Sequence, residues 1–146
     1  MADVFFLAAV NEARLGLAEG GVPIGSVLVL DGVIVGRGHN QRVQQGSVVL
    51  HAEMAALEDA GRLSAAEYRR STLYTTLSPC AMCTGAALLY GIPKVVVGEN
   101  RTFLGREDLL AGEGVVVEVL DDEACVELMA TFIAADPDLW NEDIGE

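Results

Sequence analysis

The chain has 146 residues, of which 51% are hydrophobic and 21% are charged, and its formal net charge at pH 7 is −13. This length and composition predict one soluble globular domain over residues 1–146, and no apolar run approaches the length that a membrane-spanning helix needs. The charge argues against nucleic acid or an anionic membrane as a partner, because a single lysine, Lys94, and eight scattered arginines offer no basic patch. A small neutral substrate suits this balance better.

The N-terminal stretch carries Asp3 and has neither a basic leader nor a small-residue cleavage site, so we interpret it as a helix and not as a signal peptide. Apolar residues at helical spacing predict this helix over residues 3–19, with Gly20-Gly21 ending it. We therefore expect a cytoplasmic protein.

The rest of the chain divides into short strands and helices. A hairpin is predicted from two β-rich runs around an Asp-Gly turn, a dipeptide that suits tight hairpins. In chain order we predict strands at 26–30 and 33–36, a loop at 37–50, a helix at 52–60, a strand at 72–77, a helix at 80–90, strands at 94–98 and 115–119, a helix at 121–135 and an acidic tail at 137–146. This order suggests a sheet with helices on both faces. The run 115–119 is nearly all β-branched, which predicts a strand buried on both faces.

Three side chains form a candidate metal centre: His51, Cys80 and Cys83. Catalytic zinc usually takes three protein ligands and keeps a fourth position for water. Two cysteines three apart at the start of a helix share one face, and the helix dipole there favours the thiolate. We therefore expect one Zn²⁺ per chain.

The spacing of His51 and Glu53 fits a catalytic carboxylate. Side chains two apart inside a helix diverge, so the pair converges only if His51 lies just before the first turn. Glu53 then lies beside the metal without binding it, where a carboxylate can take a proton from water and deliver it to a substrate.

Other interpretations of these residues remain open. A structural zinc site would need a fourth ligand, for which Cys125 and His39 are the candidates. The Cys-x-x-Cys pair alone is also compatible with thiol redox chemistry, and a zinc module without catalytic activity is a further alternative. The combination of His-x-Glu with Pro-Cys-x-x-Cys is, however, typical of zinc deaminases that act on cytosine or adenine.

Nearly the whole chain resembles the fungal-type cytosine deaminases of the cytidine deaminase-like superfamily. The resemblance rests on the zinc motif and on a selective C-terminal segment, together with several motifs between: Gly20-Gly-Val-Pro-Ile-Gly25, Gly36-Arg-Gly-His-Asn40, Leu73-Tyr-Thr-Thr-Leu-Ser-Pro-Cys80, Met82-Cys-Thr-Gly85, Tyr90-Gly-Ile-Pro93, Val97-Gly-Glu-Asn100 and Glu142-Asp-Ile-Gly-Glu146. It implies a three-layer α/β/α sandwich with a mixed five-stranded sheet, and a homodimer.

The resemblance also implies roles for substrate-binding residues. Asn40 matches an asparagine that hydrogen-bonds the pyrimidine, Asp143 matches a carboxylate that accepts from the leaving amino group, and the others match ring contacts and pocket walls: Ile24, Ala52, Ser78, Phe103 and Trp140. Three of these have simpler interpretations. Asn40 suits a loop turn, Trp140 suits C-terminal packing, and Asp143 suits a solvated tail.

The resemblance is incomplete at three places. Ala52 stands where the fungal enzymes have glycine, Asn141 follows the tryptophan where an aromatic residue is expected, and the stretch after Phe103 is shorter. These departures bear on the choice of ring and leave the zinc motif intact.

The resemblance implies hydrolysis of cytosine to uracil and ammonia. The alternatives are the same reaction on isocytosine, guanine, an aminotriazine or creatinine, and deamination of adenosine in tRNA. We expect residues 137–146 to close the pocket and thereby exclude nucleosides, and we expect removal of residues 139–146 to damage catalysis while leaving zinc in place.

Overall fold

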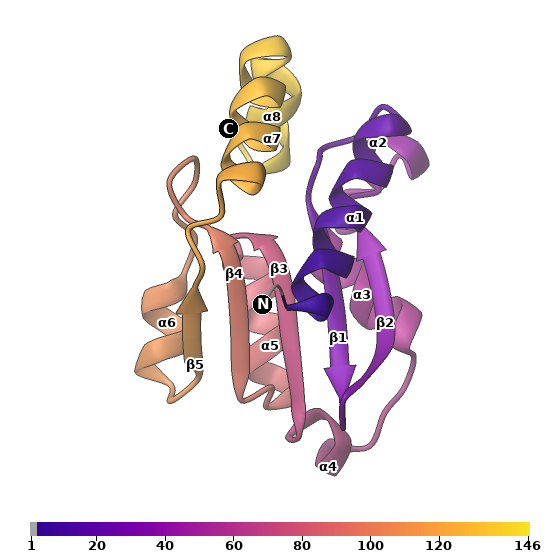
Figure 1. Cartoon of the computed structure of the whole chain (residues 1–146), viewed down its shortest axis with the longest axis vertical. Coiled ribbons are helices and arrows are strands. Elements are labelled where there is room, and N and C mark those ends of the chain that lie inside the picture. Colours follow the sequence, from indigo (N-terminus) through magenta and orange to yellow (C-terminus); the bar gives the residue numbers. More distant parts are fainter. Residues whose placement is uncertain (1–2) are drawn as a thin grey trace.

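The computed structural model describes residues 3–146, and its centre is a mixed five-stranded sheet with the strand order β2-β1-β3-β4-β5 (Figure 1). The strands are β1 (Gly25–Leu30), β2 (Val33–His39), β3 (Ser71–Leu77), β4 (Lys94–Glu99) and β5 (Val116–Val119). β1 is antiparallel to both β2 and β3, whereas β3, β4 and β5 run parallel to one another. The predicted mixed sheet is therefore confirmed.

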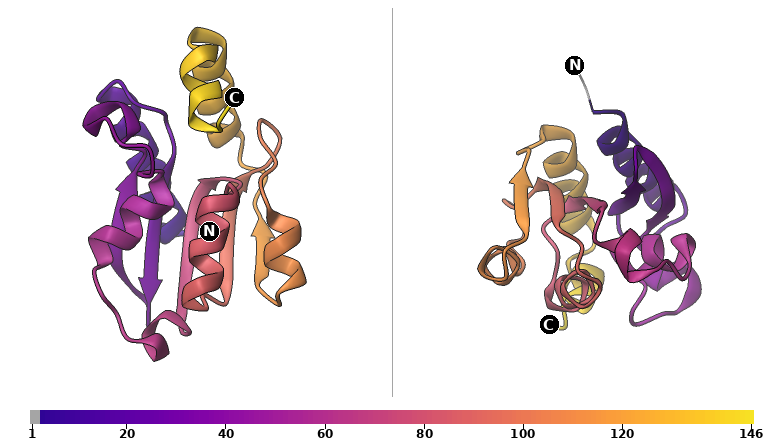
Figure 2. Two further views of the ribbon diagram at one scale, coloured as in Figure 1. Left: turned by 180° about the vertical axis from the view of Figure 1, so that it is seen from behind. Right: turned by 90° about the horizontal axis from the view of Figure 1, so that it is seen from below.

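Helices cover both faces of this sheet. They are α1 (Val4–Ala18), α2 (Arg42–Gln45), α3 (Ala52–Ala60), α4 (Ala65–Tyr68), α5 (Ala81–Tyr90), α6 (Glu107–Gly112), α7 (Glu123–Ala135) and α8 (Pro137–Asp143). On one face α1 packs through Phe6 and Val10 against Val27 and Val96, and on the other α3, α5 and α6 surround a second apolar cluster (Figure 2). The result is the predicted three-layer α/β/α sandwich.

Close packing between layers depends on glycine at two positions of β2. A Cβ atom added at Gly38 would lie 2.7 Å from Ala55 and Ala56 of α3, and one added at Gly36 would lie 2.3 Å from the Ala56 carbonyl. Because these distances are below van der Waals contact, only glycine lets α3 lie this close to the strand. This packing places the N-terminus of α3 near the end of the sheet where the candidate site lies.

The expectation of a doubly buried strand at 115–119 is wrong. β5 lies at the edge of the sheet, where Val116 is 58% exposed and Val119 is 37% exposed. A β-branched run reports a preference for extended backbone, and it does not say whether a strand has one neighbour or two. The strand pairs with β4 alone, so its outer side faces solvent.

Several segments are more helical than the sequence suggested. The stretch expected to be a loop contains the end of β2 and the short helix α2, and the acidic tail contains α8, which begins at Pro137 under an Asp136 cap. α7 begins at Glu123 and not at residue 121, because the Asp122 side chain caps it by accepting from the Cys125 amide.

A third apolar cluster lies at the carboxyl end of β3 and includes residues of α7 and α8, the two helices beyond that end of the sheet in Figure 1. It joins Leu77 of β3 to Met129 and Phe132 of α7 and to Trp140 of α8. This cluster supports the candidate site from below.

None of the helices in residues 3–146 has the length and apolar composition that a membrane span needs.

Candidate metal centre

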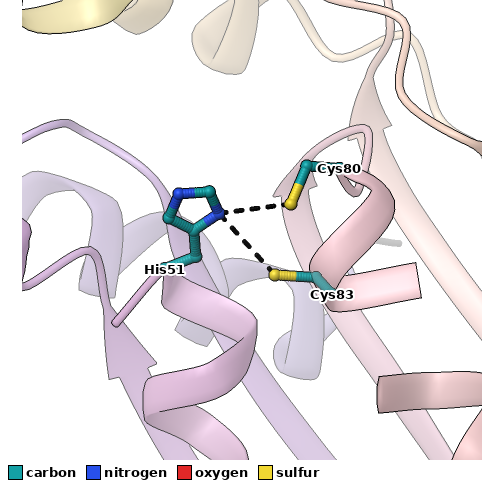
Figure 3. A group of neighbouring side chains, drawn as sticks. All are labelled: His51, Cys80 and Cys83. Carbon is teal, nitrogen blue, oxygen red and sulfur yellow. Dashed lines mark hydrogen bonds between the residues drawn. The ribbon is translucent and has the colours of Figure 1, made fainter. Parts of the chain in front are cut away.

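The three predicted ligands meet at the carboxyl end of β3. His51 is the residue before α3, with an extended backbone (φ −63°, ψ 163°), and Cys80 holds the same position before α5 (φ −68°, ψ 175°). Cys83 follows in the first turn of α5, so both thiols point toward the imidazole (Figure 3). The starts of α3 and α5, which are separated by β3 in the sequence, thus lie side by side in the fold.

The distances between these side chains suit a tetrahedral zinc ion. Nδ1 of His51 lies 3.3 Å from Sγ of Cys80 and 3.7 Å from Sγ of Cys83. Ordinary Zn–N and Zn–S bond lengths at a tetrahedral angle require about 3.6 Å between nitrogen and sulfur. Three ligand atoms with this spacing, all within 4.8 Å of one another, can therefore bind one ion and leave a fourth position open.

The other ring nitrogen of His51 is also engaged. Nε2 lies 3.1 Å from the backbone carbonyl oxygen of Asp143 and 3.4 Å from its carboxylate Oδ2. A proton on Nε2 donates to that carbonyl and leaves Nδ1 unprotonated, which is the form that binds metal. The C-terminal segment thus favours the metal-binding tautomer of this candidate ligand, through a contact that no local sequence pattern predicts.

Glu53 lies in the first turn of α3, where the His-x-Glu spacing predicts it, and it is 4% exposed. Burial raises the pKa of its carboxyl to about 7. A carboxyl group with a pKa in this range can both accept and release a proton near neutral pH.

The cluster is rich in groups that can carry negative charge. Burial opposes protonation of His51, but the Cys80 thiol and the carboxylates of Asp143 and Glu53 outweigh it and raise its pKa to about 9. The hydrogen bond from Cys83 lowers the pKa of Cys80 to about 4. Two thiols and two carboxyls lie close to one imidazole, and a divalent cation would balance the negative charge that these groups carry. The residues present therefore fit zinc.

A small cavity adjoins the metal ligands. It has a volume of about 20 Å³, which holds one water molecule. Its walls contain most of the predicted site residues: Ile24, His51, Glu53, Ser78, Cys80, Phe103, Trp140 and Asp143. A wider groove of about 470 Å³ opens outside it, with Val48, Met82 and Leu104 on its walls. The structure thus brings together residues from five separate segments around one enclosed space.

Two aromatic rings close the cavity from the side of α8. Phe103 and Trp140 pack edge to face, with ring centroids 5.7 Å apart and an interplanar angle of 81°. Trp140 is 6% exposed and also belongs to the third apolar cluster. It therefore serves C-terminal packing and lines the cavity at once.

Asn40 makes two contacts at the base of the C-terminal segment. Its Oδ1 accepts from the Arg42 amide at 3.0 Å, and its Nδ2 donates to Oδ1 of Asp143 at 2.7 Å. The first contact is the loop turn that its residue type predicted. The second shows that Asp143 is not a solvated tail charge, since its side chain is 2% exposed.

Two further predicted site residues are buried near the metal ligands. Ala52 is fully buried at the start of α3. The Ser78 hydroxyl donates its only proton to Glu107 at 2.6 Å and accepts from the Gly105 amide at 2.9 Å. Sequence reasoning missed Glu107, because nothing local to the first turn of a helix signals a contact with a segment 29 residues away.

The candidates for a fourth ligand lie elsewhere. Cys125 is 1% exposed in the apolar cluster under α1, and burial raises the pKa of its thiol. His39 places its two ring nitrogens 3.0 Å from Glu12 and 2.8 Å from Glu19. Among residues 3–146, the triad of His51, Cys80 and Cys83 is the metal-binding group that the structure contains.

The chain is similar in sequence and in fold to known deaminases. A family model for the cytidine and deoxycytidylate deaminase zinc-binding region matches residues 2–99. The chain is 55% identical over 139 residues to a cytosine deaminase of Candida albicans, covering 94% of this chain and 93% of that protein. It is 40% identical over 140 residues to a tRNA-specific adenosine deaminase of Bacillus subtilis, covering 89% and 87%. A solved guanine deaminase of Nitrosomonas europaea is similar in fold, with a TM-score of 0.70 at 21% identity, covering 92% of this chain and 86% of that one.

Proposed function

The chain belongs to the cytidine and deoxycytidylate deaminase family of zinc-dependent hydrolases, and on that premise we propose that it converts cytosine and water to uracil and ammonia. The observation that carries the proposal is the enclosed cavity, in which a buried carboxylate lies beside the metal ligands and two aromatic rings. The cytosine deaminase of Candida albicans, at 55% identity over 94% of the chain, supports the choice of base.

Each ligand and carboxylate has a part in this mechanism. Nδ1 of His51 and the thiolates of Cys80 and Cys83 would hold zinc, which when bound would supply a water molecule whose pKa is lowered toward about 7. Glu53 accepts a proton from the attacking water and passes it to ring atom N3. The water oxygen bonds to C4, and its remaining proton passes through Glu53 to the amino group as the C4–N bond breaks, so that ammonia leaves and C4 becomes the carbonyl carbon of uracil.

The other predicted site residues, in and around the cavity, orient the base. Asn40 and the backbone groups of Ala52 and Ser78 hydrogen-bond the ring, Asp143 accepts from the amino group, and Ile24, Phe103 and Trp140 enclose its faces. Enclosure excludes water and strengthens the electrostatic contacts of the base. These proposed roles are supported by position, because most of these side chains line the small cavity beside the metal ligands.

The C-terminal segment acts as a lid over this pocket within a single domain. A cavity of about 20 Å³ holds a water molecule and not a base, so a base enters only when α8 or the Phe103 ring moves. Closure over a free base leaves no room for a ribose.

A substrate panel tests this proposal. We expect ammonia release from cytosine and none from cytidine at equal concentration, and much slower release from isocytosine, guanine and creatinine. Equal or faster release from cytidine contradicts the proposed lid. The second candidate is adenosine in tRNA, favoured by the 40% identity to the Bacillus subtilis enzyme. Inosine formation in tRNA together with inactivity on cytosine would establish that alternative.

We also propose that the chain forms a homodimer through α5. This helix carries no charged residue, and its outward face presents Ala81, Gly85 and Leu89 at successive turns, with Leu89 75% exposed. A Cβ atom at Gly85 would meet nothing within 4 Å in its own chain, so a small residue there suits close approach by a second copy. Leu89→Arg should convert a dimer into a monomer by size-exclusion chromatography with light scattering, and a monomeric parent protein contradicts the proposal.

A further inference from the structure

We propose that Glu107 is a positioning residue that fastens the Phe103 loop to the metal-ligand segment. The Phe103 loop is defined as residues 100–106, between β4 and α6 (Figure 1). The inference rests on the proposed placement of Phe103 against the substrate. Glu107 acts through a charge-assisted hydrogen bond that sets the position of Phe103, an aromatic wall of the pocket. Glu107 itself contacts neither zinc nor substrate.

The two carboxylate oxygens of Glu107 bind two different segments, the Phe103 loop and the segment that leads into the metal ligands. Oε2 accepts from the Ser78 hydroxyl at 2.6 Å, and Oε1 accepts from Nδ2 of Asn100 at 3.3 Å. Ser78 lies two residues before the ligand Cys80. A single carboxylate thus connects the start of the Phe103 loop with the segment that leads into the metal site.

The end of the loop is held against the same segment. Gly105 donates its amide to the Ser78 hydroxyl at 2.9 Å, and Arg106 donates its amide to the Pro79 carbonyl at 2.9 Å. A Cβ atom at Gly105 would lie 1.9 Å from that carbonyl, so only glycine permits this approach. Since the Ser78 hydroxyl donates to Glu107 and accepts from Gly105, it has no proton left to donate to a substrate.

The start of the loop is held by Glu99, which is fully buried. Its carboxylate accepts from the Arg101 amide at 2.7 Å and from the Thr102 amide at 2.9 Å. With both ends held, the central residue Phe103 is directed against Trp140, where the two rings meet edge to face. Hydrogen bonds to a charged acceptor are about twice as strong as neutral ones, so loss of the Glu107 carboxylate removes one of the stronger contacts that hold the loop in place.

Trp140 provides a readout that does not depend on activity. It is the only tryptophan in the chain. Excitation at roughly 295 nm selects the indole ring, so the fluorescence emission reports how Phe103 packs against Trp140. In Glu107→Ala we expect a red-shifted emission that acrylamide quenches more readily. We also expect KM for cytosine to rise by about tenfold or more, the worth of a hydrogen bond to a charged group, with a smaller change in kcat.

The matched control is Asp108→Ala, which removes a negative charge from the same first turn of α6 but pairs only with the exposed Arg106 side chain. It should leave the Trp140 emission, KM and zinc content unchanged. Bound zinc should stay at one per chain in both variants, because neither residue is a ligand. Glu107→Gln keeps one acceptor oxygen, so it should be intermediate in KM and emission.

A double-mutant cycle decides the case even if Glu107→Ala folds poorly. Ser78→Ala removes the donor of this contact and Glu107→Gln removes the charge of its acceptor, so we expect the double variant to raise KM no further than the more severe single variant. Additive effects in the cycle, or a Trp140 emission identical to that of the parent protein in both single variants, overturn the proposal. Loss of zinc from Glu107→Gln also overturns it. Inactivity of the parent protein on cytosine refutes the proposed function instead, and the emission measurement still tests Glu107.

Discussion

Replacing Asn40 tests how the C-terminal segment is held over the site. The side chain is fully buried and accepts from the Arg42 amide at 3.0 Å while donating to the Asp143 carboxylate at 2.7 Å. Asn40→Ala removes both contacts. The hydrogen bond to a buried charge contributes about 1.5–3 kcal/mol and the neutral turn contact about 1 kcal/mol, so the expected loss of stability is roughly 3 kcal/mol.

A loss of this size is measurable. In a chain of this length each kcal/mol lowers Tm by about 2–4 °C, which predicts a decrease of roughly 6–12 °C in the zinc-loaded protein, followed by circular dichroism. The carboxylate of Asp143 would keep two neighbours, His51 with Nε2 3.4 Å from Oδ2 and Arg42 with Nη1 3.9 Å from Oδ1. We therefore expect activity on cytosine to fall as well, because the segment that lines the cavity loses its anchor.

Asn40→Asp separates the two contacts. It keeps an acceptor for the Arg42 amide but loses the donor and faces Asp143 with a second carboxyl, so it should lower Tm at least as much as Asn40→Ala. Asn141→Ala, an exposed asparagine of α8, is the control and should leave Tm unchanged. A Tm within about 2 °C of the parent protein for both Asn40 variants would refute the reasoning, since two buried hydrogen bonds would then contribute nothing.

Three further predictions concern the metal, the catalytic carboxylate and a buried histidine. Cys83→Ser should lose most of the single zinc ion per chain by elemental analysis, and a chelator, not a thiol reductant, should abolish activity. Glu53→Gln should keep zinc but lower kcat by about 10²–10⁴-fold, the usual worth of general acid–base catalysis; near-normal turnover with zinc bound would remove Glu53 from the mechanism. Burial lowers the pKa of His39, but hydrogen bonds to Glu12 and Glu19 outweigh this and raise it. Since the folded-state pKa lies above that of the unfolded chain, the contribution of His39 to stability is complete below about pH 6.5 and is lost as pH rises through the folded-state pKa. Thermal unfolding across this range should show this loss in the parent protein and a smaller one in His39→Gln.

The sequence predicted the elements whose signals are local. Helical periodicity, the Asp31-Gly32 turn and β-branched runs predicted most strands and helices within a few residues, because backbone preferences act between near neighbours. The zinc site was predictable for the same reason. Its ligands come as a His-x-Glu pair and a Cys-x-x-Cys pair, and each pair is shaped by one helix start.

Other features depended on contacts between distant segments. Val116 to Val119 has the composition of a central strand, and only its position at the sheet edge exposes it. Asn40 meets Asp143 across 103 residues of chain, and the Ser78 hydroxyl meets Glu107 across 29. No local pattern encodes such pairs, because the partner of a buried polar group is decided by how the layers pack.

The difference between what the sequence determined and what the fold decided has a physical cause. The identity and spacing of His51, Glu53, Cys80 and Cys83 limited the chemistry to that of a zinc hydrolase before any fold was known, because few other sites need those groups together. The tertiary structure decided what surrounds that chemistry. It carried Asp143 to the outer nitrogen of His51 and enclosed the cavity, because burial and long-range hydrogen bonds exist only once the chain is folded.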